Sequence, residues 1–286
     1  MQITPLTPRF GAAITGVQLG NLDDAQFAAI KQAWHQHRGL LAFPKQQVSD
    51  DGLLVFSRRL GQLDSPPNQE NGRQSPEGYP DIYVVSNVKD NAGRPIGALG
   101  DGEAVWHTDM SYETSPPLAS MLTAREIPAS GGDTWFCDMI GICEDLPAAL
   151  RQRIAPLKVK HDGTYNSGGY LRAGLTATDD PMTSPGTPHP IICRHPQSGE
   201  QTLYLGRRRN AYVVGLPRAE SEALLDRLWA HVAQPQFAFA HAWRVGDVLM
   251  WDNRSTLHRR DPFDAEARRL MYRTQVKGRS LPQQAV

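Results

Sequence analysis

Two side chains of metal-binding type stand one residue apart in the segment Trp106-His107-Thr108-Asp109. Residues two apart on a β-strand point to the same face, so the imidazole and the carboxylate converge if this segment is a strand. A second histidine would complete a set of two histidines and one carboxylate, which leaves three positions open on an octahedral iron(II) ion. A bidentate 2-oxo acid and molecular oxygen fill three positions, so the pattern indicates oxygenase chemistry.

Short patterns of this kind also arise by chance. The alternative interpretation is that His107 is a hydrogen-bonded histidine of the core and that Asp109 caps a loop. The sequence contains nine histidines, and the choice depends on whether another of them lies in a segment that reaches this pair.

His258 is the histidine whose surroundings favour that role. It follows an apolar strand at 248–251 and a turn, and Arg269 and Arg273 come eleven and fifteen residues after it. We expect an antiparallel return strand to bring both arginines beside the metal on one face. One guanidinium would bind the distal carboxylate of 2-oxoglutarate and the other an anionic group of the substrate. The alternative is a solvated edge strand, and for Arg268 on the opposite face we keep that interpretation.

Helices and strands that position these residues are predicted along the whole chain. Helices are expected from Asp23 or Asp24 to about His37, after the cap Ser49, over Glu144–Ile154 and after Pro217. Strands are expected at 12–19, 40–44, 82–86, 237–243, 247–251 and 270–276. The polar stretches 65–81 and 161–189 are too long for simple turns, and we expect them to act as lids or substrate-binding loops.

Composition and charge describe an ordinary globular protein. The chain has 286 residues, 40% of them hydrophobic, and 30 basic residues balance 30 acidic ones. Nothing here favours nucleic acid as a partner, and the run Arg207-Arg208-Arg209 is expected on a solvated surface. Three cysteines without metal-like spacing, no apparent leader and no membrane-spanning run predict a cytoplasmic protein. No repeat or linker is visible, so we expect one domain over residues 1–286.

Several ordered motifs together resemble the family of taurine and chlorophenoxyacetate dioxygenases (TauD/TfdA-like), which use iron(II) and 2-oxoglutarate. The resemblance extends over nearly the whole chain. The motifs that carry it are Phe10–Val17, Phe56–Gly61, Trp106–Asp109, Gly131-Gly132-Asp133-Thr134, Gly246-Asp247 and Met250-Trp251-Asp252-Asn253-Arg254, followed by His258 and the arginines.

This resemblance implies a mixed α+β protein with a mainly β core, a double-stranded β-helix (jelly roll), with flanking helices and a large insert. It implies that the iron ligands are His107, Asp109 and His258, and that O2 is the oxidant. Thr134 and Arg269 resemble the pair that binds the far carboxylate of 2-oxoglutarate. Arg273 resembles the arginine that meets the acidic group of the primary substrate. Members of the family are often dimers or tetramers, so a homo-oligomer is expected.

The sequence departs from the taurine-specific pattern in two places. No histidine stands between Arg38 and Trp106, where taurine enzymes have one, and Glu103 replaces an asparagine of the substrate pocket. We therefore expect a small anionic organic substrate other than taurine, with Glu103 facing a cationic group or solvent. A non-catalytic jelly-roll binding protein and a zinc-dependent hydrolase with the same ligands remain the alternative functions.

Overall fold

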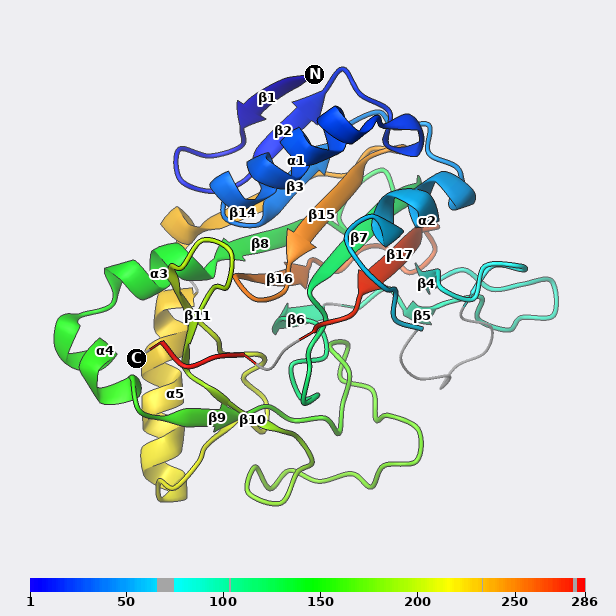
Figure 1. Ribbon diagram of the computed structural model, residues 1–286. Coiled ribbons are helices and arrows are strands. Elements are labelled where there is room, and N and C mark those ends of the chain that lie inside the picture. The colour runs from blue at the N-terminus through cyan, green and yellow to red at the C-terminus, as the bar shows by residue number, and fades with distance from the viewer. Residues whose placement is uncertain (66–74, 103, 233, 280–281, 286) are drawn as a thin grey trace.

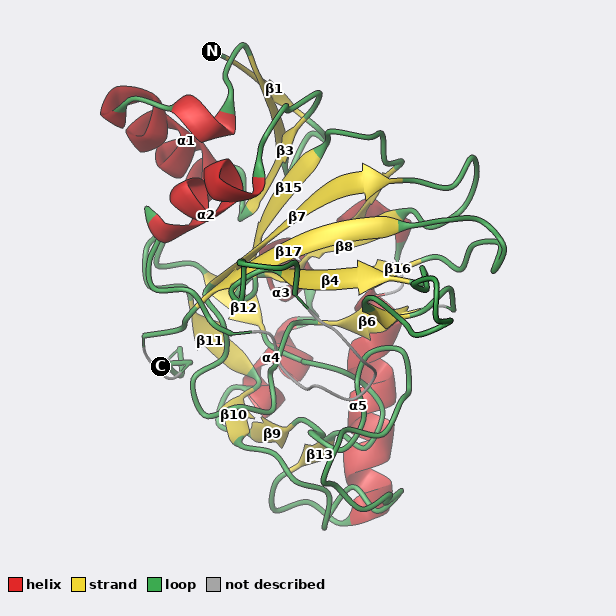
Figure 2. Ribbon diagram, turned by 90° about the vertical axis from the view of Figure 1, so that its right-hand side faces the viewer, coloured by secondary structure: helices red, strands yellow, loops and turns green. Residues whose placement is uncertain are grey.

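The computed structural model describes residues 1–65, 75–102, 104–232, 234–279 and 282–285. Within these residues two mainly antiparallel sheets dominate the structure (Figures 1 and 2). The larger sheet has the strand order β1 (Gln2–Pro5), β2 (Ala12–Thr15), β3 (Leu40–Phe43), β15 (Val248–Asp252), β7 (Ala119–Glu126), β17 (Leu270–Val276), β4 (Tyr83–Ser86) and β5 (Ala98–Leu99). The smaller sheet has the order β14 (Ala238–His241), β8 (Thr134–Asp138), β16 (Thr256–Arg260) and β6 (Ala104–His107).

Alternating side chains divide the larger sheet into two apolar faces. Leu249 and Trp251 of β15 belong to a cluster with Phe136 of the smaller sheet, whereas Val248 and Met250 belong to a different cluster. Strand β3 splits in the same way, with Leu40 and Ala42 on the first face and Leu41 and Phe43 on the second. This period of two is what a strand buried on both faces requires. The first face therefore packs against the smaller sheet.

Two N-terminal helices cover the other face of the larger sheet (Figure 2). They are α1 (Asp24–Gln36) and α2 (Asp50–Arg58). Both begin where the sequence predicts, because Asp23 forms a capping box with Gln26 and the Ser49 hydroxyl accepts a hydrogen bond from the Gly52 amide. Gly39 follows α1 with φ +89°, and a Cβ there would lie 2.7 Å from Asp252 Cβ, so the turn requires glycine.

The helices α3 (Met139–Asp145), α4 (Ala148–Ile154) and α5 (Arg218–Val232) pack on the outer face of the smaller sheet, around Cys137 and Leu257. The prediction of one helix over Glu144–Ile154 is wrong. Pro147 has no amide hydrogen, and its ring forces the preceding residue, Leu146, into an extended conformation with ψ 136°. Two short helices therefore meet at this proline.

The long polar segment 161–189 is irregular over most of its length, as predicted, and ends in β10 (Pro188–Pro190). Most of the other predicted loop, 65–81, lies outside the described residues. Strand β10 pairs with β9 (Lys158–Lys160), which also pairs with β13 (Tyr212–Val213). A separate hairpin joins β11 (Ile192–Arg194) and β12 (Gln201–Leu203). No helix in the described part of the chain combines the length and apolar character needed to cross a membrane.

Asp138 connects the smaller sheet to α3, and its removal should destabilise the protein. Its buried carboxylate accepts hydrogen bonds from the amides of Ile140 and Gly141 and pairs with Arg38 at 3.0 Å. We expect Asp138→Ala to lower the free energy of unfolding by about 3 kcal/mol in urea titrations, because a helix cap and a buried ion pair are both lost. Asp145→Ala, at the exposed end of the same helix, is the control and should change stability by less than about 0.5 kcal/mol. Equal effects of the two substitutions would contradict this account.

Candidate active site

Strand pairing places His258 opposite His107. Strand β16 runs antiparallel to β6, and these two histidines are partners in the register. Their ring centroids are 4.1 Å apart. His258 lies on the face of β16 that looks toward the larger sheet, where its ring is 4.8 Å from that of Trp251. Two histidines separated by 151 positions in the sequence are thus neighbours in the space between the sheets.

Asp109 reaches the same point from a turn. The prediction that His107 and Asp109 share a strand is wrong, because β6 ends at His107 and Asp109 follows in the turn. The carboxylate is held by two partners from the larger sheet. Ser120 on β7 donates to Oδ2 at 2.7 Å, and Arg273 on β17 donates to Oδ1 at 2.9 Å. Side chains from the facing sheet, and not the strand period, therefore orient this carboxylate.

The three side chains have the donor set and the spacing of a metal site. One ligand atom from each of His107, Asp109 and His258 lies within 4.8 Å of the others, and all three residues are buried. Each histidine Nε2 is 3.9 Å from Asp109 Oδ1. Donor atoms that are each about 2.1 Å from one ion lie at most about 4.2 Å apart, so the two 3.9 Å separations are compatible with a shared ion. Two imidazoles and one carboxylate on one side of an ion are the ligands that iron(II) oxygenases use.

The protonation states also suit metal binding. Burial lowers the pKa of His107 to about 4 and that of His258 well below its ordinary value, so both rings are neutral at neutral pH. His107 Nδ1 lies 2.7 Å from the carbonyl oxygen of Val105 and must donate to it, which leaves Nε2 as the free electron pair. Burial opposes ionisation of Asp109, but the Arg273 guanidinium and the Ser120 hydrogen bond lower its pKa overall.

A hydrogen-bond network behind Asp109 fixes Ser120. The Asn253 amide donates to Ser120 Oγ at 3.0 Å and accepts from the indole of Trp251 at 3.0 Å. The carbonyl oxygen of Asn253 accepts from Thr108 Oγ1 at 2.7 Å. The sequence motif that contains Trp251 and Asn253 supports the resemblance, but nothing in the sequence identified Ser120.

One cavity on the inner side of the triad is lined by the predicted co-substrate residues, Thr134 and Arg269, and by Arg260, His258 and Trp251. Arg269 is 2% exposed, and burial together with the nearby Arg260 lowers its pKa to about 9, so it stays charged at neutral pH. Its Nη2 donates to the carbonyl oxygen of Gly132 at 3.3 Å, while its buried Nε has no partner among the described residues. The hydroxyl of Thr134 accepts from the Trp243 indole at 2.9 Å and keeps its own proton free to donate.

The strand that brings Arg269 and Arg273 to the site pairs with other strands than predicted. Strand β17 pairs with β7 and β4 in the larger sheet and not with the strand that carries His258. Arg269 precedes β17, and the register shifts between Leu270 and Met271. Both Arg269 and Arg273 nevertheless line the cavity beside His258. Arg268 is exposed, as predicted, and pairs with Glu126 at 2.6 Å, but the predicted edge strand is wrong, because β17 pairs with β7 on one side and β4 on the other.

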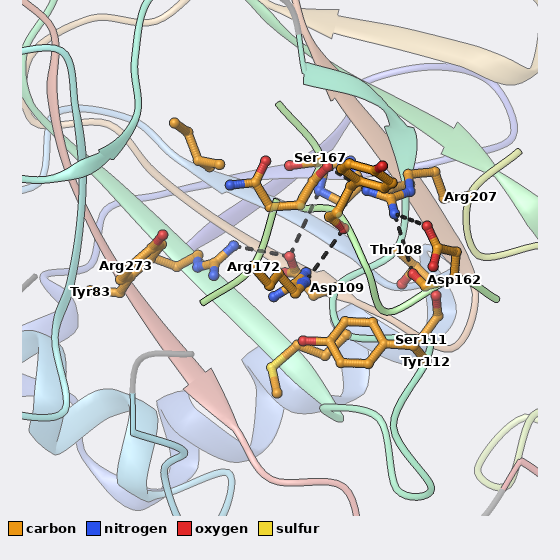
Figure 3. Close-up of a pocket in the computed structure, with 15 residues that line it drawn as sticks. Tyr83, Thr108, Asp109, Ser111, Tyr112, Asp162, Ser167, Arg172, Arg207 and Arg273 are labelled. Carbon is orange, nitrogen blue, oxygen red and sulfur yellow. Dashed lines mark hydrogen bonds and ion pairs between the residues drawn. The ribbon is translucent and has the colours of Figure 1, made fainter. Parts of the chain in front are cut away.

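A second cavity, open to solvent, lies on the outer side of the triad and is lined by polar, charged and aromatic side chains. Figure 3 shows Arg273 and Tyr83 on one side of Asp109, and Arg207 with Asp162 on the other. The prediction that Arg207 lies on a solvated surface is wrong. Its side chain is buried, and its guanidinium donates hydrogen bonds to the carbonyl oxygens of Asp162 and Asn166, which hold it inward.

The chain matches the family described as "Taurine catabolism dioxygenase TauD, TfdA family" over residues 2–275. The chain belongs to the TauD/TfdA family. It is 35% identical to the (S)-phenoxypropionate/alpha-ketoglutarate-dioxygenase of Delftia acidovorans, with 98% of this chain and 96% of that protein covered. It is 32% identical to the alpha-ketoglutarate-dependent 2,4-dichlorophenoxyacetate dioxygenase of Cupriavidus pinatubonensis, with 94% and 95% covered.

Solved structures from the TauD/TfdA family share this architecture. A taurine dioxygenase from Burkholderia xenovorans superposes with a TM-score of 0.77 at 30% identity, covering 97% of this chain and 90% of that one. AAD-2 in complex with Mn(II) and N-oxalylglycine gives a TM-score of 0.79 at 26% identity, with 98% of both chains covered. The protein is an iron(II)- and 2-oxoglutarate-dependent dioxygenase (2-oxoglutarate and alpha-ketoglutarate are the same compound).

Glu103, which stands where taurine enzymes have an asparagine of the substrate pocket, lies outside the described residues. Its role in substrate binding stays a prediction. The segment 161–189 contributes Asp162, Tyr165, Asn166 and Arg172 to the outer cavity, as expected of a substrate-binding loop, and its closure as a lid also stays a prediction.

Ser120 should tune metal affinity through Asp109. We expect Ser120→Ala to weaken iron(II) or Mn(II) binding by about 10- to 100-fold in calorimetric titrations, because the carboxylate loses the hydrogen bond that orients it. Thr123→Ala on the opposite face of the same strand is the control, since its buried hydroxyl has no partner among the described residues. An unchanged dissociation constant in Ser120→Ala, with a folded protein by circular dichroism, would rule out this role.

Proposed function

We propose that this chain hydroxylates a small anionic organic substrate and releases succinate and carbon dioxide, with His107, Asp109 and His258 as the iron ligands. The observation that carries the proposal is the position of the triad between two cavities. One cavity has a buried cation in Arg269, and the other has one in Arg273. Such an arrangement accommodates an anionic co-substrate and an anionic substrate on either side of one ion.

For the co-substrate, we assign Thr134 and Arg269 to the distal carboxylate of 2-oxoglutarate. A buried guanidinium with unused donors is unfavourable unless an anion completes its hydrogen bonds. Arg269 has such donors, and the Thr134 hydroxyl beside it has a proton to give. A carboxylate placed between them would accept charge-assisted hydrogen bonds from the planar guanidinium of Arg269 and a hydrogen bond from the hydroxyl of Thr134.

For the primary substrate, we assign Arg273 to the acidic group. Its Nη1 binds Asp109, its guanidinium lies 4.7 Å above the ring of Tyr83, and its buried Nε has no partner among the described residues. Arg273 lines both cavities. An anion bound here would sit close to Asp109 and so bring the neighbouring C–H toward the metal.

The bound iron supplies the activation of oxygen, with 2-oxoglutarate as the reductant that becomes succinate and carbon dioxide while one oxygen atom enters a substrate C–H bond. The residues of the chain hold the reactants in place and exclude bulk water. Because Asp109 fills the carboxylate position, which related halogenating enzymes leave to chloride, we infer hydroxylation. If the hydroxylated carbon bears a heteroatom, the product would break down to an aldehyde or ketone.

The relatives guide the choice of substrate class. Their names include dioxygenases of phenoxypropionate, of 2,4-dichlorophenoxyacetate and, in Pseudomonas putida, of sulfate esters. We infer a sulfonate, carboxylate or amino acid as the substrate here. A non-catalytic binding protein would not need a suitable residue at every position expected to bind iron or 2-oxoglutarate. A zinc hydrolase would leave Thr134, Arg269 and Arg273 without a role.

The wider architecture is part of the proposal. We infer that the two facing sheets form a double-stranded β-helix and that residues 1–286 make a single domain. The family similarity supports the first point, and the continuous strand pairing between β2 near the N-terminus and β17 near the C-terminus supports the second. A cytoplasmic location and a homodimer or homotetramer follow from the sequence analysis as further proposals.

Oxygen consumption that depends on 2-oxoglutarate tests the reaction. We expect a panel of small carboxylates, sulfonates and sulfate esters to include compounds that stimulate succinate release and oxygen uptake in an iron(II)-dependent manner. Chelation of the metal, or His258→Ala, should abolish both signals because a ligand position is lost. Substrate turnover that continues without 2-oxoglutarate, with zinc in place of iron, would instead favour the hydrolase.

Substitutions of Arg269 and Arg273 should impair the binding of two different ligands. We expect Arg269→Ala to weaken 2-oxoglutarate binding to the metal-loaded protein by about 100-fold, because a buried bidentate contact is lost. Arg273→Ala should retain 2-oxoglutarate binding and lose substrate-stimulated succinate release. Arg268→Ala, which removes the exposed neighbour of the pair, is the control. Equal loss of both ligands in Arg269→Ala and Arg273→Ala would contradict the division of roles.

A further inference from the structure

The outer cavity contains more positive charge than one acidic group needs. Five charged side chains line it, and these are Asp109, Asp162, Arg172, Arg207 and Arg273. Three arginines thus face two carboxylates, and Asp109 belongs to the metal site in the proposed function. Such an excess in a partly enclosed space attracts anions and orients them.

The positive charge of Arg207 is largely offset by the negative charge of Asp162. The Arg207 side chain is buried, and its Nη2 donates to the Asp162 carbonyl oxygen at 3.2 Å and lies 3.5 Å from the Asp162 carboxylate. Its Nη1 donates to the carbonyl oxygen of Asn166. Burial lowers its pKa to about 10, which leaves it charged at neutral pH. This residue therefore fixes the wall formed by residues 162–166 and adds little net charge.

Arg172 is different, because its charge is not offset by a nearby carboxylate. Its Nε makes one long hydrogen bond to the Tyr165 carbonyl oxygen at 3.4 Å, and its guanidinium lies 4.5 Å from the centre of the Tyr112 ring. No carboxylate of the described residues lies within ion-pair distance of it. The stacked, half-buried guanidinium keeps its terminal N–H groups available at the cavity wall.

The sum of the charges in the site indicates how much negative charge the substrate should carry. In the proposed site, iron(II) is balanced by Asp109 and the metal-bound carboxylate of 2-oxoglutarate, and Arg269 balances the distal carboxylate. Arg207 is balanced by Asp162. Arg172 and Arg273 remain, which amounts to two positive charges in the wall of one cavity. A ligand with two negative charges would neutralise both.

We propose that Arg172 forms a second anion-binding subsite, supported by Arg207, and that the preferred substrates are dianions with one acidic group at Arg273 and the other at Arg172. This inference rests on the proposed function. It adds a specificity-determining residue on the 161–189 segment to the arginine of the sheet. Tyr83, Tyr112 and Tyr165 also line this cavity, so a ligand held by both arginines would have aromatic side chains beside it.

The test compares monoanions with dianions on the same skeleton. Phenoxyacetate and its 2-, 3- and 4-carboxy derivatives are titrated by calorimetry into the full-length protein, loaded with iron(II) and 2-oxoglutarate without oxygen. We expect at least one carboxyphenoxyacetate to bind about tenfold or more tightly than phenoxyacetate, as one additional charge-assisted contact predicts. Arg172→Gln should reduce this preference by about tenfold, and Arg172→Lys should restore part of it.

Arg153→Gln is the matched control. Arg153 lies on the exposed surface of α4, pairs with Glu220 at 2.7 Å and is not part of the cavity wall, so its loss changes the net charge of the protein equally but should keep the preference for the dianion. Equal affinity of the wild-type protein for all four acids overturns the inference. So does an equal loss of monoanion and dianion binding in Arg172→Gln, since Arg172 would then hold a single acidic group together with Arg273.

The experiments distinguish failure of the proposed function from failure of the second subsite. If the dianion binds with the expected preference but no compound of the panel stimulates succinate release, the hydroxylation proposal is wrong and the second subsite stands. If monoanions are hydroxylated and the dianions show no preference, the reaction stands and the second subsite is wrong.

Discussion

The pairing of β16 with β6 is the constraint on which the active site depends. It places His258 and His107 as direct neighbours in one ladder of hydrogen bonds. The third side chain of the triad, Asp109, is anchored by Ser120 and Arg273 of the opposite sheet. Any displacement of the two sheets relative to each other would therefore separate the carboxylate from the imidazoles. The packing of Trp251, Phe136 and Leu249 between the sheets prevents such a displacement.

Buried arginines distinguish this site from an ordinary cleft. Arg260, Arg269 and Arg273 are all at most 7% exposed, and each has an Nε without a partner among the described residues. Charges in this environment destabilise the folded state unless anions complete their hydrogen bonds. Guanidinium groups thus lie on both sides of the triad, and in the proposed function the bound anions would offset the cost of burying them. Preorganised binding groups of this kind need no rearrangement when the ligand arrives.

Local sequence signals predicted the N-terminal helices and several strands of the larger sheet, but not the central strands β7 and β8. The caps at Asp23 and Ser49 and the apolar strands at 40–44, 82–86 and 270–276 were recognisable because they depend on neighbouring residues alone. The division of the segment 139–154 at Pro147 was also present in the sequence, as a residue that lacks an amide hydrogen, but the apolar spacing on both sides concealed it. The burial of Arg207 was not predictable from a run of three arginines, which resembles a solvated surface.

Residue types and spacing indicated the chemistry of this protein: a His-x-Asp pair, a distant histidine and two arginines four positions apart suggest an iron(II) oxygenase with anionic ligands, and the longer motifs of the TauD/TfdA family made that interpretation specific. The tertiary structure alone decided how they meet. The register between strands 150 residues apart, the turn that carries Asp109 and the contact with Ser120 arise from hydrogen bonds between distant segments. Local periodicity reports which face a side chain occupies, but it contains no information about which strand lies opposite. For that reason the metal ligands could be named from the sequence. The hydrogen bonds that orient them, and the proposed second anion-binding subsite at Arg172, could not.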